Sequence, residues 1–287
     1  MLLLLLVSVL WALSFGLTAS VGGLGATFVA AVRTVLAALV FLPFLQVRGL
    51  PPRRAWAFVG IGALQFGLMY LFYIASFQWL RSSEVALFTI FTPLYVTLAG
   101  DLVERRFSAL FLVTAALAVA GTGICVWTGL GRTGFLRGFL LMQASNLCFA
   151  FGQVLYRRAA TASGRTDRDL MGLLYLGATA VTCALAAPFA PLDRLRAVDL
   201  GQALVLVYLG VVASGLGFFL FNAGARRTDL GTLAVLNNAK IPLAILASGL
   251  VFGDPVDWPR LALGGAILAL ALGLNHAGRA LPRLLGP

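Results

Sequence analysis

Acidic residues are scarce in this chain, and none lies in the middle of an apolar segment. Only 10 of the 287 residues are Asp or Glu, against 21 Lys or Arg. The acidic residues lie at the edges of the apolar runs, as Glu84, Asp101 and Asp199 do. Carriers that exchange cationic drugs for protons need a buried acid that can hold either one. The composition therefore argues against that class of carrier.

Histidine and cysteine are almost absent as well. The single histidine, His276, lies at the end of the last apolar run, and the three cysteines fall inside apolar runs. An odd number of buried cysteines implies no disulfide framework. The sequence also shows no cluster of metal ligands and no nucleophile beside a base. We therefore expect no enzyme, no cofactor and no metal site.

Apolar residues dominate what is present. Hydrophobic residues make up 61% of the chain and charged residues 11%, with a mean hydropathy of +0.98. No soluble domain can bury that much apolar surface, so we expect an all-α polytopic membrane protein. Apolar runs between helix breakers predict ten transmembrane helices. They cover residues 2–19, 24–46, 55–77, 83–100, 108–127, 134–156, 170–190, 199–222, 231–251 and 260–276.

The two halves of the chain repeat each other. Pro93 in the fourth predicted helix is matched 149 residues later by Pro242 in the ninth. Pro43 and Pro188 form a second pair, 145 residues apart. Residues 1–130 and 131–287 would each hold five helices, so the second copy is inverted, as in many transporters. The longest polar stretch, residues 157–169, is predicted to be a cytoplasmic linker between the sixth and seventh helices.

Arginines predict the orientation in the membrane. With the amino terminus in the cytoplasm, 13 arginines fall on the cytoplasmic side and 6 on the other. The first set is Arg48, Arg53, Arg54, Arg105, Arg106, Arg157, Arg158, Arg165, Arg168, Arg226, Arg227, Arg279 and Arg283. The second set is Arg81, Arg132, Arg137, Arg194, Arg196 and Arg260. Because basic residues favour the cytoplasmic side, we expect both termini there.

Four segments resemble the EamA branch of the drug/metabolite transporter superfamily. They are LWALSFG at 10–16, AAVRTVLAALVFLPF at 30–44, FTPLYVTLAGDLVERRFS at 91–108 and LCFAFGQVLYRR at 147–158. The resemblance implies a ten-helix carrier of small metabolites in the bacterial inner (plasma) membrane, often an exporter of amino acids or related compounds. The NNAKIP run at 237–242 also resembles a stretch of the ninth helix of nucleotide-sugar carriers, where it helps to bind substrate.

Lys240 is the only lysine of the chain and the tenth of the 21 residues of Gly231–Val251. At that depth, about 13–15 Å from either end of the helix, its amine cannot reach the headgroups. A charge there costs roughly 2.5–3.5 kcal/mol on insertion scales. We therefore predict a protein-lined cavity in which Lys240 faces an anionic or zwitterionic substrate. The alternative is a structural lysine held by neighbouring carbonyl groups.

Other polar and aromatic residues are candidates for the same site. Pro242 frees the carbonyl of Asn238, and Gln143 and Asn146 share one helical stripe. The stripe fits either substrate contacts or hydrogen bonds between helices. The predicted substrate-binding residues are Lys240, Asn237, Asn238, Asn146, Gln143, Trp11, Tyr73 and Asn222. Arg33, nine to ten residues into the second helix and partly within reach of the outer surface, is interpreted as structural, bonding carbonyls or closing an outer gate.

These features predict a secondary transporter of an amino acid or organic carboxylate that works by alternating access, and the family resemblance implies export. The alternatives are a carrier of larger phosphorylated or nucleotide-like anions and a membrane sensor that does not transport. Protons are a candidate coupling ion, because an anion beside Lys240 favours the protonated amine. Facilitated diffusion stays open, as does the choice between a monomer and a homodimer.

Overall fold

The computed structural model describes residues 2–104, 133–189, 191–227 and 240–251, with ten scattered positions between 253 and 270. Every regular element in this described part is helical. Seven of its segments are long and apolar enough to cross a membrane. They are Leu2–Ser20, Ala26–Phe44, Pro52–Ser76, Ser82–Val103, Phe135–Ser163, Asp167–Phe189 and Leu200–Ala225. The prediction of an all-α polytopic membrane protein is confirmed.

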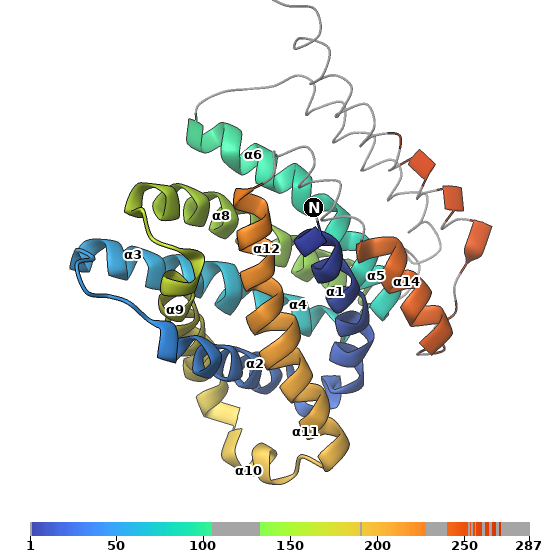
Figure 1. The fold of residues 1–287 in the computed structure, drawn as a ribbon. Coiled ribbons are helices and arrows are strands. Elements are labelled where there is room, and N and C mark those ends of the chain that lie inside the picture. The colour runs from blue at the N-terminus through green and yellow to red at the C-terminus, as the bar shows by residue number, and fades with distance from the viewer. Residues whose placement is uncertain are drawn as a thin grey trace, which may run out of the picture.

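Several of these spans contain more than one helical element (Figure 1). Those before the gap are α1 (Leu2–Ser20), α2 (Ala26–Phe41), α3 (Pro52–Gly62), α4 (Met69–Ser76), α5 (Ser82–Phe88) and α6 (Thr92–Glu104). Those after it are α8 (Phe135–Ser163), α9 (Asp167–Ala186), α10 (Pro191–Arg196), α11 (Leu200–Val207), α12 (Gly217–Arg226) and α14 (Lys240–Val251). The predicted fifth helix, the first part of the ninth and most of the tenth lie outside the described residues, so ten helices in two inverted repeats stay a prediction.

The connection between α8 and α9 is shorter than predicted. Residues 157–163 of the predicted linker continue α8, because their alanines favour a helix and no breaker precedes Gly164. Gly164 ends α8 with a φ of 66°, in the left-handed region that favours glycine. Thr166 then begins α9 with a capping box that pairs it with Asp169. Only residues 164–166 connect the two helices.

The two halves share local features in the described part of the chain. Pro43 lies in a 3₁₀ turn, Leu42–Phe44, directly after α2, and Pro188 lies in another, Ala187–Phe189, directly after α9. Proline suits these places because it cannot donate a backbone hydrogen bond within a helix. Each half also contains a π-helical turn inside a membrane span, η3 (Ala63–Leu68) and η6 (Tyr208–Leu216).

Pro93, predicted to kink the fourth span, lies where the span changes helix type. The α5 helix ends at Phe88, a 3₁₀ turn covers Thr89–Phe91, and α6 begins at Thr92. Pro93 is therefore the second residue of α6, a position whose N–H would have no helical partner anyway. The break leaves Thr89 and Thr92 buried in the middle of the span.

The helices close around α1, α2 and α4 (Figure 1). The α1 helix packs against α12 and α14, α2 against α9 and η6, and α4 against α8. Two glycines let α3 and α9 approach closely: a Cβ at Gly62 would overlap the backbone of Leu174, and one at Gly177 would overlap that of Val59. Small residues at such crossings are typical of helix packing in membranes.

Arginine contacts group the loops at two ends of the bundle. At one end Arg165 donates to the carbonyl of Arg48, and Arg54 donates to the carbonyl of Ala162 at 3.3 Å. At the other end Arg194 donates to the carbonyl of Leu24 at 2.5 Å. These contacts join arginines and loops that the sequence also assigns to a common side.

Candidate substrate-binding site

A cavity lies among the helices and is partly open to solvent; the empty space in and at it, open solvent included, is about 530 Å³. Its walls come from α1, α2, α4, α6, α8, α12, α14 and the 3₁₀ turn after α5. The lining residues are Trp11, Ser14, Phe15, Arg33, Met69, Tyr70, Tyr73, Thr89, Thr92, Met142, Ser145, Asn146, Phe149, Phe218 and Lys240.

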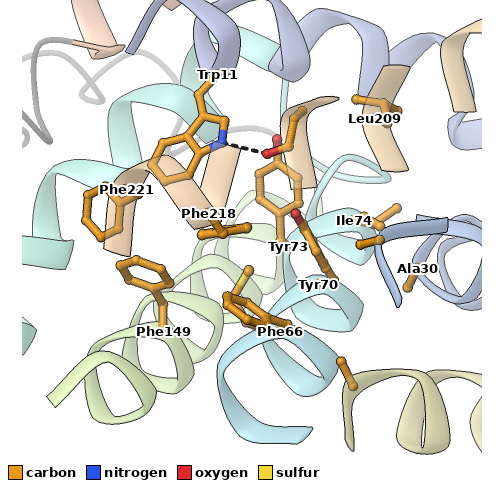
Figure 2. Close-up of a cluster of buried hydrophobic side chains, with 14 of the residues drawn as sticks. Trp11, Ala30, Phe66, Tyr70, Tyr73, Ile74, Phe149, Leu209, Phe218 and Phe221 are labelled. Carbon is orange, nitrogen blue, oxygen red and sulfur yellow. Dashed lines mark hydrogen bonds between the residues drawn. The ribbon is translucent and has the colours of Figure 1, made fainter. Parts of the chain in front are cut away.

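One wall of the cavity is aromatic (Figure 2). The ring centroid of Trp11 lies 4.8 Å from that of Phe218, which in turn lies 5.8 Å from that of Phe149. The indole N–H of Trp11 donates to the carbonyl of Ala213 at 2.9 Å, the dashed line in Figure 2. The π-helical turn that holds Ala213 therefore fixes the orientation of the indole, and the wall offers flat, rigid surfaces to an apolar group.

Lys240 lies in this cavity and is buried, with 6% of its surface exposed. It is the first residue of α14, which packs against α1. Its Nζ lies 4.9 Å from the centroid of the Trp11 ring, within the range of a cation–π interaction. The predicted protein-lined cavity around this lysine is present, and the substrate that it would face remains a proposal.

Arg33 is a second cation in the same cavity, with 2% of its surface exposed. Its guanidinium donates to three hydroxyl groups, from Thr18, Tyr70 and Ser214. It also lies 4.2 Å from the centroid of the Tyr70 ring. The sequence interpretation of Arg33 as a residue that bonds carbonyls is therefore wrong, because its partners are side-chain hydroxyls deep between helices.

Asn146 lines the cavity, and Gln143 stands behind it. The Asn146 amide nitrogen donates to the carbonyl of Phe88 at 2.8 Å, and its oxygen accepts from the hydroxyl of Thr92 at 3.2 Å. Gln143 accepts from Asn146 at 3.4 Å and from Tyr95 at 3.1 Å, and it is not among the lining residues. The predicted polar stripe thus divides into one cavity residue and one residue that supports it.

The remaining predicted residues have different outcomes. Tyr73 lines the cavity together with Trp11. Asn222 does not: it is fully buried, with its amide nitrogen 3.6 Å from the sulfur of Met171. Asn237 and Asn238 lie outside the described residues. The sequence missed Thr92, Met142 and Ser145 as members of the site, since apolar periodicity alone does not show which helices meet.

The charges of the cavity are all of one sign. Its lining residues include two cations, Arg33 and Lys240, with hydroxyls, one amide and aromatic rings, but no Asp or Glu. Such a site can bind an anionic group and an apolar body at the same time. In the described part of the chain, no three His, Cys, Asp or Glu side chains gather as metal ligands would.

Comparison with known proteins decides the family. The model of the EamA-like transporter family matches residues 1–127 and 136–275. This chain belongs to the EamA-like transporter family. The family is part of the drug/metabolite transporter superfamily, so the resemblance seen in the sequence is confirmed. This EamA-family protein is a multi-pass membrane transporter of a small metabolite and not an enzyme.

Several relatives share nearly the full length of this EamA-family transporter. A protein of Pseudomonas aeruginosa named "Probable biotin transporter" is 43% identical over 281 residues, covering 96% of this chain and 97% of the relative. Proteins of Salmonella typhimurium and Escherichia coli K12 named "Biotin transporter" are 36% identical, covering 96% of this chain and 93% of each relative. One crystal structure matches with a TM-score of 0.69 at 20% identity, covering 100% of this chain and 97% of the other, a likeness of fold alone.

Proposed function

We propose that this chain transports biotin across the bacterial inner membrane by alternating access. The relatives named as biotin transporters support the choice of substrate. The observation that carries the proposal is a cavity that joins two buried cations to an aromatic wall, with no acid among its lining residues. Both termini are placed in the cytoplasm, as the arginines predict.

Biotin has the chemistry that such a cavity would bind. It carries a carboxylate at the end of an aliphatic chain and a fused ring system with a cyclic urea. A carboxylate that leaves water needs a positive partner, and Lys240 supplies the charge that draws it into the membrane. The rings of Trp11, Phe149 and Phe218 offer apolar surface to the aliphatic chain and the fused rings. The hydroxyl of Thr92 and the amide of Asn146 offer hydrogen bonds to the urea.

A free amino acid is a weaker candidate than biotin. Its ammonium group needs an anionic or strongly polar acceptor when it is buried. The described cavity residues offer two cations and no carboxylate, so an ammonium group would meet charges of its own sign. We therefore favour a monovalent organic acid over the amino acid that the family resemblance first implied.

Counterflow in proteoliposomes tests the proposal without assuming a direction of transport. We expect vesicles loaded with unlabelled biotin to accumulate labelled biotin, and amino acids not to compete. The Lys240→Met variant should insert normally and lose at least about tenfold in initial rate, because the carboxylate loses a buried charged partner. No biotin counterflow, with flux of another metabolite from a broad panel, would refute the substrate. Binding without any flux would instead identify a sensor.

Proton-coupled transport and facilitated diffusion differ in what happens to the proton of Lys240. If the Lys240 amine takes up a proton together with the anion, substrate and proton move together. If the amine keeps its proton throughout, biotin moves down its own gradient. An imposed pH gradient separates these cases: it should drive uphill biotin accumulation only in the first.

A further inference from the structure

The guanidinium of Arg33, a residue that lines the cavity, has two N–H groups with no hydrogen-bond acceptor among the described residues. A guanidinium has five N–H donors. Three are used: Nε donates to Ser214 at 3.2 Å, Nη1 to Thr18 at 3.0 Å and Nη2 to Tyr70 at 3.2 Å. One N–H therefore remains on each terminal nitrogen, and Arg33 lines the cavity. Two N–H groups on neighbouring nitrogens form the fork that binds both oxygens of a carboxylate.

The surroundings of Arg33 fix this fork without neutralising it. Its three hydrogen-bond acceptors are hydroxyl groups from α1, α4 and η6, which carry no charge. The hydroxyls of Tyr70 and Ser214 also lie 2.6 Å apart and bond each other. A side chain that is already held by several contacts loses little conformational entropy when a ligand arrives. Arg33 is thus a preorganised cation whose counter-ion is not among the described cavity residues.

The two cations of the cavity offer different chemistry. Lys240 is a point charge on a flexible stem, so it attracts an anion with little regard to its shape. Arg33 presents a flat pair of donors, so it favours a flat pair of acceptors. A carboxylate has that shape, whereas a carboxamide of nearly the same size offers one oxygen acceptor and a nitrogen that is itself a donor.

We propose that Arg33 is a second substrate-binding residue, which binds the carboxylate of the substrate through both terminal nitrogens and selects acids over amides. Lys240 supplies attraction for the negative charge, and Arg33 supplies the recognition of its shape. Biotin as the ligand rests on the proposed function, but the preference for a carboxylate does not. Thr18 acts as a positioning residue, since it bonds Arg33 and does not line the cavity.

Thermal stabilisation of the purified protein tests this assignment. The ligands are biotin, its carboxamide, and a panel of other aliphatic and aromatic acids, each paired with its amide. We expect the wild type to need at least about tenfold more amide than acid for the same stabilisation. Arg33→Lys keeps the charge but not the fork, and should bring acid and amide within about threefold of each other. Arg196→Lys is the matched control, because that side chain is 82% exposed, and it should behave as wild type.

The outcomes separate this inference from the proposed function. A folded Arg33→Lys variant that keeps the full preference, or that weakens acid and amide equally, overturns the inference and leaves biotin transport intact. Stabilisation by other acids but not by biotin, dependent on Arg33, supports the inference and removes biotin. If Arg33→Lys does not fold, Thr18→Val decides: a reduced preference supports the assignment, and an unchanged one overturns it. No stabilisation by any acid overturns both.

Discussion

The single residue Trp11 connects the amine of Lys240 to the aromatic wall of the cavity. Its ring faces the amine of Lys240 at 4.9 Å and packs against Phe218, while its N–H is held by the carbonyl of Ala213. Cation–π and aromatic contacts are each worth about 0.5–1.5 kcal/mol. We expect Trp11→Leu to raise the half-saturating concentration of biotin about tenfold in counterflow. Trp56→Leu, at a 74% exposed position, should leave it unchanged; equal values for the two variants would contradict a role for the indole.

The sequence predicts how deep a residue lies in the membrane, but not which way its side chain points. Lys240, Trp11, Tyr73 and Asn146 were found because polar or aromatic groups in apolar runs are costly or distinctive, and all four line the cavity. Asn222 is also a polar residue of an apolar run and is predicted to bind substrate, yet it lies beside Met171 and does not line the cavity. Equal depth in two helices does not mean that both side chains face the same space.

Arg33 also shows that the sequence does not reveal the direction of a side chain. Its position, nine to ten residues from the outer end of a predicted helix, suggests that its long side chain could partly reach the outer membrane surface. In the structure it is nearly fully buried and turns toward the interior. Lys240 stands out because it is a charge within an apolar run with no buried acid to neutralise it. The same is true of Arg33.

At the scale of helices, the contact between α3 and α9 depends on glycine. A Cβ at Gly62 would overlap the backbone of Leu174, whereas one at Gly60, on the same helix, would meet no atom within 4 Å. We expect Gly62→Ala to destabilise the protein by about 1–3 kcal/mol, the usual effect of overpacking. Its melting temperature in detergent should fall by several degrees. Gly60→Ala should melt like wild type, and equal melting of both variants would mean that the helices separate freely.

The helices themselves were largely predictable, and their irregular turns were not. Apolar runs predict six of the seven observed spans to within a few residues. The exception is α8, because RRAATAS reads as polar although it favours a helix. The π-helical turns η3 and η6 have no clear sequence signature, since they depend on how neighbouring helices pack. In η6, for example, Ser214 donates to the carbonyl of Leu209, a contact that spans five residues.

Across the whole molecule, the arginines predict which end faces the cytoplasm. Ala162, in the last turn of α8, and Ala197, just after α10, are both exposed and lie at opposite ends of the bundle. In a background without Cys125, Cys148 and Cys183, we expect Ala197→Cys to react with an impermeant maleimide on intact cells. Ala162→Cys should react only after the membrane is opened. The reverse pattern would invert the topology and place both termini outside.

The single lysine also makes the site chemically unique. Among the side chains of the 287 residues, Lys240 carries the only primary amine. A small acylating reagent that enters the cavity would therefore modify this one side chain, and the mass of the intact protein would report it directly. The rate at which this amine is acylated would thus report, on the unaltered protein, whether the cavity is occupied. With a reagent added on one side of the membrane, the same rate would report to which face the cavity opens.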